Sequence, residues 1–134
     1  MDLNFFKQTR ILDGGMGQEL LAKGMKPNGT LWSANATLKE EYHKLLLETH
    51  VDFINAGAEV IVTATFTSRR KRLRENVVED KFAYLNKKAG EIAFRTKEKF
   101  PNIKIAAGLP PQNLTYEADE RSENEIIDNI NEQA

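Results

Sequence analysis

Apolar residues gather in three short runs along the chain, and each run has the composition of a buried strand. The first, Ile11 and Leu12, leads into a turn sequence with glycines at positions 14, 15 and 17. Residues 59–66 form a second run that is β-branched and apolar on both faces, as in a parallel strand covered on both sides. Residues 103–108 form the third run. The pattern therefore predicts three strands.

Between the first two predicted strands, apolar residues recur every three or four positions. This spacing predicts a helix over residues 37–56. Thr37 and Glu40 are placed as a capping box at its start, and Gly57 follows as a C-terminal stop.

Two further helices are predicted later in the chain. Helical spacing over residues 82–100 stops at Pro101, which cannot continue a helix. Ser122 and Glu125 form another capping box, which predicts a last helix up to Ala134.

The elements alternate between strand and helix, which predicts an α/β fold with parallel strands. Right-handed connections place consecutive helices on one side of a growing sheet. A complete TIM-type (β/α)8 barrel needs about 250 residues. We therefore expect residues 1–134 to be the N-terminal segment of one barrel domain, a partial barrel of about three β/α units.

Composition narrows the range of functions. With 19 Lys and Arg against 20 Asp and Glu, the net charge is −1, which favours neither nucleic acid nor an anionic membrane. The sequence shows no signal peptide and no apolar stretch long enough to span a membrane, so we expect a cytoplasmic protein. The chain has no cysteine, which removes thiol nucleophiles and thiolate metal ligands.

The strongest candidate for chemistry is Asp13 with the glycine turn that follows it. The carboxyl end of a strand is where α/β folds place their ligands. The Asp13 carboxylate could pair with a substrate ammonium group, while backbone N–H groups of the turn bind a carboxylate. The alternative is a turn aspartate that accepts backbone hydrogen bonds beside glycines with positive φ. Spacing alone leaves both interpretations open.

Aromatic and hydroxyl side chains could line the same site. Trp32 lies in the long loop before the first predicted helix and could form an apolar wall or seal the rim of the barrel. Thr65 and Phe66 end the second predicted strand on the same side as Asp13, although threonine is also common in strands for its β-propensity alone.

The remaining charged candidates have simpler structural explanations. His50, near the end of the first predicted helix, is more typical of a hydrogen-bonded structural residue, and His43 is expected to face solvent. Residues 69–74 contain five basic side chains that could touch phosphate, but acidic residues follow closely, which favours a solvated helix face.

Taken in order, these segments resemble the zinc-dependent homocysteine S-methyltransferases, whose methyl donors are betaine, S-methylmethionine or a folate. Residues 11–20 resemble the opening strand and loop of that family, and residues 31–34 its next signature. Residues 50–66 resemble its helix-to-strand passage, and residues 108–111 the loop after its third strand. The resemblance covers nearly the whole chain.

The resemblance implies a pocket for a homocysteine-like amino acid, in which Asp13 binds the ammonium group and the backbone after it meets the carboxylate. The residues expected to bind substrate are Asp13, Gly14, Gly15, Met16, Trp32, Thr65 and Phe66. The family activates the homocysteine thiol on zinc held by three cysteines from later strands, so we expect no cofactor, no metal ligand and no catalytic residue in this chain.

Three interpretations of this segment stay open. It could be part of a methyltransferase that is inactive alone, or one half of a split enzyme completed by a C-terminal half chain. It could also be a non-catalytic fragment that binds an amino acid or another protein. An apolar inner face with open strand edges would favour self-association or a partner.

Overall fold

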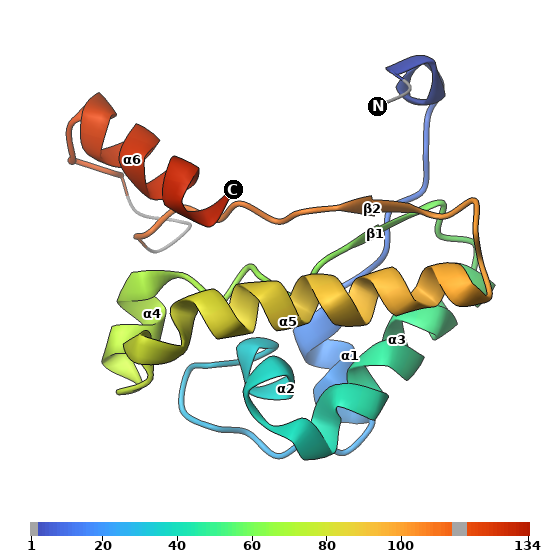
Figure 1. Ribbon diagram of the computed structural model, residues 1–134, viewed down its shortest axis with the longest axis horizontal. Helices are drawn as coiled ribbons and strands as arrows, with labels where there is room; N and C mark the ends of the chain where they lie inside the picture. The colour runs from blue at the N-terminus through green and yellow to red at the C-terminus, as the bar shows by residue number, and fades with distance from the viewer. Residues whose placement is uncertain (1–2, 114–117) are drawn as a thin grey trace.

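The structure is a computed structural model that describes residues 3–113 and 118–134, and it has a mixed α/β fold (Figure 1). Its elements in chain order are η1 (Leu3–Lys7), α1 (Met16–Ala22), α2 (Ala34–Leu38), η2 (Glu40–Tyr42), α3 (His43–Asn55), β1 (Val60–Val62), α4 (Arg70–Glu75), η3 (Glu79–Lys81), α5 (Phe82–Arg95), η4 (Thr96–Glu98), β2 (Lys104–Ala106) and α6 (Glu123–Gln133), where η marks a 3-10 helix.

The three predicted strand segments lie side by side and run parallel. β1 pairs with β2, with Ile61 opposite Ile105. On the other side of β1, Leu12 forms a single parallel bridge to Val60. The strands are shorter than the apolar runs because the chain turns after Val62, where the Thr65 N–H donates to the Thr63 carbonyl oxygen at 2.7 Å.

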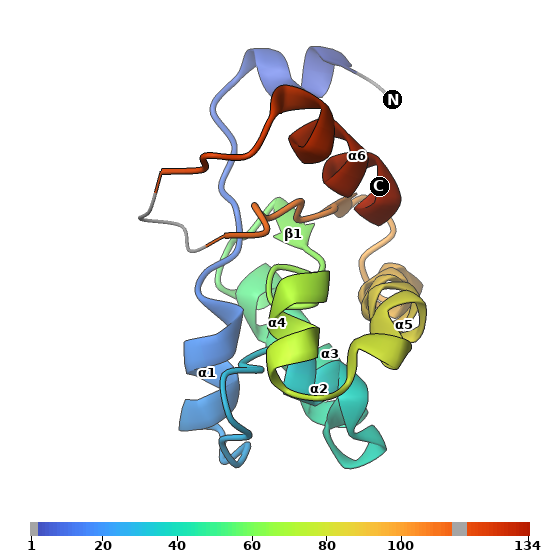
Figure 2. The same ribbon diagram turned by 90° about the vertical axis from the view of Figure 1, so that its left-hand side faces the viewer.

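Most of the helices cover one face of the sheet and leave the other face largely uncovered. α1, α2, α3 and α5 lie on one side of the strands in Figure 1, as right-handed connections require. α4 and α6 lie at the end of the molecule toward which β1 runs. Figure 2 views the molecule from this end, with α1 and α5 on either side of β1.

Apolar faces of these helices form the core. One buried cluster joins Leu20 of α1, Leu46 of α3 and Ile92 of α5. A second cluster places Leu73 of α4 against Leu85 of α5. Leu20, Leu46, Leu73 and Leu85 are each fully buried, so truncating any one of them to alanine would cost about 2–5 kcal/mol of unfolding free energy.

The helix predicted over residues 37–56 is confirmed only in its later part, as α3, and its start and capping box are wrong. Thr37 is buried inside α2, where its hydroxyl donates to the Ala34 carbonyl oxygen at 2.9 Å, so it does not cap a helix. Lys39 then adopts extended backbone angles (φ −103, ψ 118), and η2 precedes α3. The apolar spacing continues across this break.

Other helix signals are confirmed. Gly57 has φ +110 and donates its N–H to the Ile54 carbonyl oxygen, which ends α3. The capping box of Ser122 and Glu125 is present at the start of α6. α5 matches the second predicted helix but tightens into η4 before Pro101. Among the described residues, the helices all lack the combination of length and apolarity that crossing a membrane requires.

Candidate functional site

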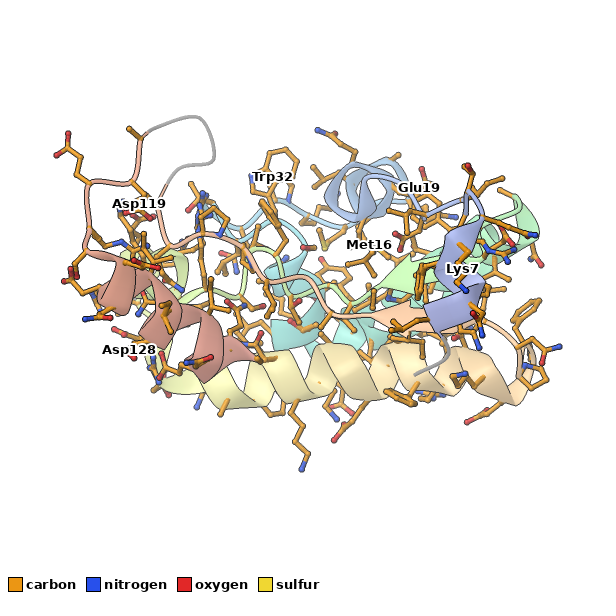
Figure 3. The ribbon with its side chains drawn as sticks, turned by 90° about the horizontal axis from the view of Figure 1, so that it is seen from above. Lys7, Met16, Glu19, Trp32, Asp119 and Asp128 are labelled. Carbon is orange, nitrogen blue, oxygen red and sulfur yellow. The ribbon has the colours of Figure 1, made fainter. Side chains whose placement is uncertain are left out.

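A cavity of about 770 Å³ opens beside the carboxyl end of β1, within the size range of small-molecule sites. Trp32 and Met16, both labelled in Figure 3, line it from the side of the strands away from α5. The lining residues that the sequence predicted are Asp13, Gly14, Gly15, Met16, Trp32 and Phe66. The structure thus brings together six of the seven predicted binding residues.

Asp13 combines a structural role with a position on the cavity wall. Its Oδ2 accepts the Val62 N–H at 2.9 Å, and its own N–H donates to the Val60 carbonyl oxygen at 3.0 Å. Asp13 is therefore a turn aspartate that fastens the end of β1. Burial raises the pKa of its carboxyl group, and the hydrogen bond from Val62 opposes that rise. A substrate ammonium group beside it would favour the charged carboxylate again.

His50 lies directly behind Asp13. Its Nδ1 is 4.0 Å from the Asp13 Oδ2, and its side chain is fully buried. Neither ring nitrogen has a hydrogen-bond partner among the described residues. The expectation that His50 is hydrogen-bonded is therefore wrong for the described residues. Burial lowers the pKa of His50 from an ordinary 6.5 to about 4, so the ring is neutral at pH 7.

The His50 site should make folding stability depend on pH. An unfolded chain protonates this histidine near pH 6.5, whereas the folded chain resists protonation down to about pH 4. The unfolded state therefore binds more protons in this window, and stability should fall by up to about 3 kcal/mol as pH drops through it. The raised pKa of Asp13 acts in the opposite direction and offsets part of the loss.

Denaturant titrations of His50→Phe at several pH values would measure this effect. The phenyl ring has no polar atom to leave unpaired, so the variant should match the wild type at pH 7 to within about 1 kcal/mol and lose most of the slope below it. His43→Gln is the control and should keep the slope, because the His43 ring is only partly buried and already bonds the Thr37 carbonyl oxygen. A His50→Phe slope equal to that of the wild type would contradict this account.

Two glycines of the turn, Gly14 and Gly17, are packed closely, whereas Gly15 has room for a Cβ. A Cβ at Gly14 would lie 2.8 Å from Phe53 Cε1, and one at Gly17 would lie 3.0 Å from Trp32 Cε3. None of the turn glycines has positive φ, so the left-handed explanation is wrong here. Trp32 itself has φ 48, an unfavourable conformation for a side chain of this size. The surrounding structure must maintain this strained backbone, and the indole lines the cavity, where Trp32 is 43% exposed.

Thr65 does not join the other predicted residues. Its hydroxyl donates to the Gly108 carbonyl oxygen at 2.8 Å and lies 3.1 Å from the Thr63 hydroxyl, on a different side of the turn from the cavity. The prediction assumed that the strand extends to Phe66. β1 ends at Val62, and in the turn that follows the Thr65 hydroxyl is held by Gly108 and Thr63, whereas Phe66 lines the cavity.

Residues 69–74 are not simply a solvated face. Arg70 and Arg74 are outward and pair with Glu132 and Glu79. Arg69 and Arg72 instead line the cavity, and Arg69 is only 3% exposed. Arg69 precedes the helix with extended backbone angles (φ −82, ψ 146), so helical spacing does not separate this pair from its neighbours, and composition does not either.

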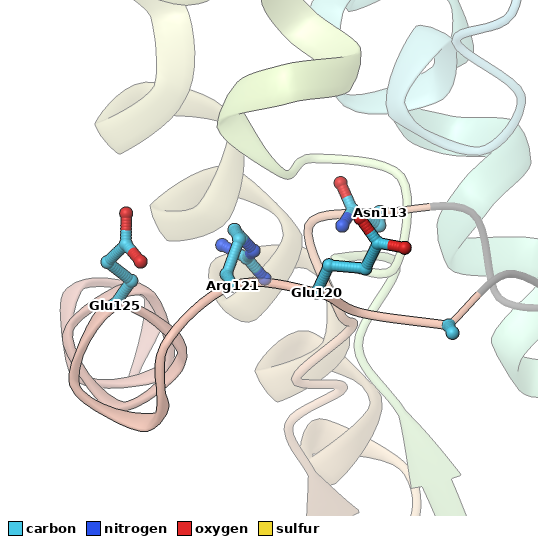
Figure 4. Close-up of a pocket in the computed structure, with 5 residues that line it drawn as sticks. Asn113, Glu120, Arg121 and Glu125 are labelled. Atoms are coloured by element: carbon cyan, nitrogen blue, oxygen red, sulfur yellow. The ribbon is translucent and has the colours of Figure 1, made fainter.

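A second hollow, of about 680 Å³, lies next to the start of α6 and is shown in Figure 4. Its polar groups already serve local structure. Arg121 binds Asp119, with 2.6 Å between Nη2 and Oδ2, and Glu125 belongs to the capping box of α6. The cavity at Asp13 is therefore the stronger candidate for a ligand site.

The residues of this chain cannot form the three-cysteine zinc site of the family that the sequence resembles. The sequence has no cysteine. Among residues 3–113 and 118–134, His, Asp and Glu form no group of three that could hold a metal ion. No step of the chemistry is therefore assigned to a metal on these residues.

The fold and the cavity define an α/β protein with a candidate ligand site where parallel strands end. The family model for homocysteine S-methyltransferase matches residues 10–134. The chain belongs to the homocysteine S-methyltransferase family.

Individual relatives agree with this assignment. Homocysteine S-methyltransferase 2 of Saccharomyces cerevisiae is 35% identical over 78 residues, 52% of this chain and 24% of that protein. Homocysteine S-methyltransferase 2 of Zea mays is 31% identical over 103 residues, 76% of this chain and 30% of that protein. The chain thus matches less than a third of the length of these relatives.

The crystal structure of the homocysteine methyltransferase MmuM from Escherichia coli in its metallated form shows the same fold. It superimposes with a TM-score of 0.76 over 98% of this chain and 52% of that chain, at 24% identity. The chain therefore spans about half of the MmuM chain.

Proposed function

We propose that residues 1–134 form the amino-terminal part of a TIM-type barrel that transfers a methyl group to the thiol of homocysteine. The observation that carries this proposal is the cavity at the end of β1, which Asp13 and the glycine turn line in a member of this family. The family match and the shared fold with part of MmuM support a segment of about three β/α units.

In this proposal the cavity holds the amino acid by its polar groups. The Asp13 carboxylate accepts the ammonium group, and the backbone of Gly14, Gly15 and Met16 meets the carboxylate. Trp32 and Phe66 form apolar walls beside the side chain of the substrate. Activation of the thiol depends on residues outside these 134, because a free thiol with a pKa of about 8.5 is mostly protonated at neutral pH.

The open edge of the sheet supports completion of the barrel by further strands. Ile11 and Leu12, at the edge away from β2, are 60% and 58% exposed. An exposed apolar edge of this kind favours pairing with another strand. In sedimentation experiments, the isolated chain should therefore self-associate, and a purely monomeric chain at high concentration would argue against an open barrel edge.

Homocysteine binding by the chain tests the proposed function. Trp32 is the single tryptophan of the sequence and borders the cavity, so its fluorescence reports binding directly. L-homocysteine should change the emission in a saturable way, and the deaminated analogue should bind at least about tenfold more weakly because it lacks the charged partner of Asp13. Equal binding of both compounds would remove the basis for the proposed role of Asp13.

A further inference from the structure

Arg69 and Arg72 are set apart from the neighbouring basic residues by their surroundings. Both line the cavity at the end of β1. The Arg69 side chain is almost completely buried, and the Arg72 side chain is 14% exposed. Long cationic side chains are rarely buried to this extent unless an anion or a set of acceptors compensates the charge.

The two guanidinium groups receive only partial compensation. Arg69 Nη1 donates to the Pro111 carbonyl oxygen at 2.8 Å, and Arg72 Nη1 donates to the Thr30 carbonyl oxygen at 3.0 Å. Both Nε atoms are buried without a hydrogen-bond partner among the described residues. Each arginine therefore has a neutral acceptor and an unused donor.

Carboxylates are scarce around this pair. Within the described part of the chain, Arg69 forms no ion pair, and Arg72 reaches only the exposed Glu75, at 4.0 Å from its Nε. The two cations also act on each other. Burial lowers the pKa of Arg69, the charge of Arg72 lowers it further, and the Glu75 carboxylate offsets part of that decrease. A bound anion would relieve both the desolvation and the repulsion.

We propose that Arg69 and Arg72 form an anion subsite of the cavity, which takes a carboxylate group of a bound substrate. One guanidinium for each carboxylate oxygen would use the two free Nε–H donors, a charge-assisted arrangement that suits a planar anion. The subsite rests on the proposed function and deepens it, since the carboxylate would belong to the methyl donor, or to homocysteine in place of the backbone contacts proposed above. Asp13, of opposite charge, lines the same cavity and would orient a ligand that carries both charges.

The unused Nε–H groups allow a direct test by NMR of the full 134-residue chain labelled at the arginine side chains. The probe is propionate, with chloride at equal ionic strength as the reference. Propionate should shift the Nε resonances of Arg69 and Arg72 in a saturable way and leave that of Arg74 unchanged. Arg74 is the internal reference because it lies on the same helix but is paired with Glu79 on the surface.

Substitutions complete the test. Arg72→Gln should weaken propionate binding at least about tenfold. Arg72→Lys, which keeps the charge but loses the planar fork, should bind more weakly than the wild type and more strongly than Arg72→Gln. Arg74→Gln is the matched control and should bind propionate like the wild type. The amide spectrum of each variant verifies that it is folded.

Several outcomes would overturn the subsite. Unchanged Nε resonances with propionate would do so, and so would equal affinities of Arg72→Gln and Arg74→Gln. A shift with inorganic phosphate but none with propionate would reject a carboxylate subsite. The titration of Trp32 fluorescence with homocysteine separates this proposal from the proposed function. If the chain binds propionate at the arginines but does not bind homocysteine, the subsite is supported and the proposed methyltransferase role is rejected. If it binds homocysteine but not propionate, only the subsite is rejected.

The same resonances identify the source of the carboxylate. If homocysteine shifts them and its decarboxylated analogue does not, the subsite holds the carboxylate of homocysteine. If propionate still shifts them at saturating homocysteine, the subsite serves the methyl donor. Either result supports the carboxylate subsite.

Discussion

The isolated 134-residue chain should transfer no methyl group from S-methylmethionine to homocysteine above the uncatalysed rate. The sequence contains no cysteine, and its described residues contain no group of three metal-binding side chains. The homocysteine thiol would stay mostly protonated in the cavity, so the nucleophile would not be prepared. We expect the same result with betaine and with a methylated folate as donors.

A methyl-transfer assay with purified chain, homocysteine and added zinc measures this directly. The control adds the part of MmuM that this chain does not match, and activity that appears only in the mixture would support a barrel completed by residues outside these 134. Turnover by the chain alone that survives a chelator and repurification would contradict the account, because it would require a metal-free mechanism within these residues.

Replacing Asp13 by asparagine should weaken homocysteine binding about a hundredfold, because the substrate ammonium group would lose its charged partner in a buried site. Asparagine keeps an oxygen that can accept the Val62 N–H, so the end of β1 should remain fastened. Alanine at position 13 would remove that acceptor. A loss of binding could then result from a destabilised fold instead of from the missing charge. Calorimetry of wild type and variant gives the two affinities.

The matched control for this substitution is Asp52→Asn. Asp52 is exposed and pairs with Lys23 at 2.6 Å, outside the cavity, so its variant should bind homocysteine like the wild type. Thermal unfolding of both variants verifies that each is folded at the temperature of the titration. If Asp13→Asn binds homocysteine as tightly as Asp52→Asn does, Asp13 has only its structural role.

Elements with a strong local signal were predictable from the sequence. α5 has its apolar residues on one face over almost four turns, and β1 and β2 lie inside β-branched apolar runs. The order of the strands also follows from their sequence order. α1 was missed because seven residues are too few for a helical period to show above the background, whereas α4 lies within the basic segment that was expected to form a helix face.

The break at Lys39 shows where local patterns fail. Apolar spacing continues from α2 into α3, and Thr37 and Glu40 have the composition of a capping box. The burial of Thr37 and its bond to Ala34 decide the local structure instead, and these depend on tertiary packing that the sequence pattern does not reveal. A cap sequence is therefore weaker evidence inside an apolar region than at the polar start of α6.

The candidate site was predictable to the extent that strand ends could be placed. Asp13 and Phe66 reach one cavity because Leu12 and β1 are neighbours in the sheet. Thr65 was grouped with Phe66 although neighbouring residues of a strand face opposite sides, and its hydroxyl bonds the Gly108 carbonyl oxygen away from the cavity. The different surroundings of Arg69 and Arg72 could not be predicted, because a basic cluster has the same composition whether it faces solvent or a cavity.

A chemical-shift map of homocysteine binding is the most direct test of the central claim that this chain carries the amino-acid pocket of a homocysteine S-methyltransferase. The backbone amides of the chain would be followed by NMR during a titration with L-homocysteine. We predict saturable shifts at Gly14, Gly15 and Trp32 around the cavity, with the amides around Asn113 and Arg121 unchanged. Shifts confined to the hollow beside α6, or no saturable shift at millimolar homocysteine, would contradict the account.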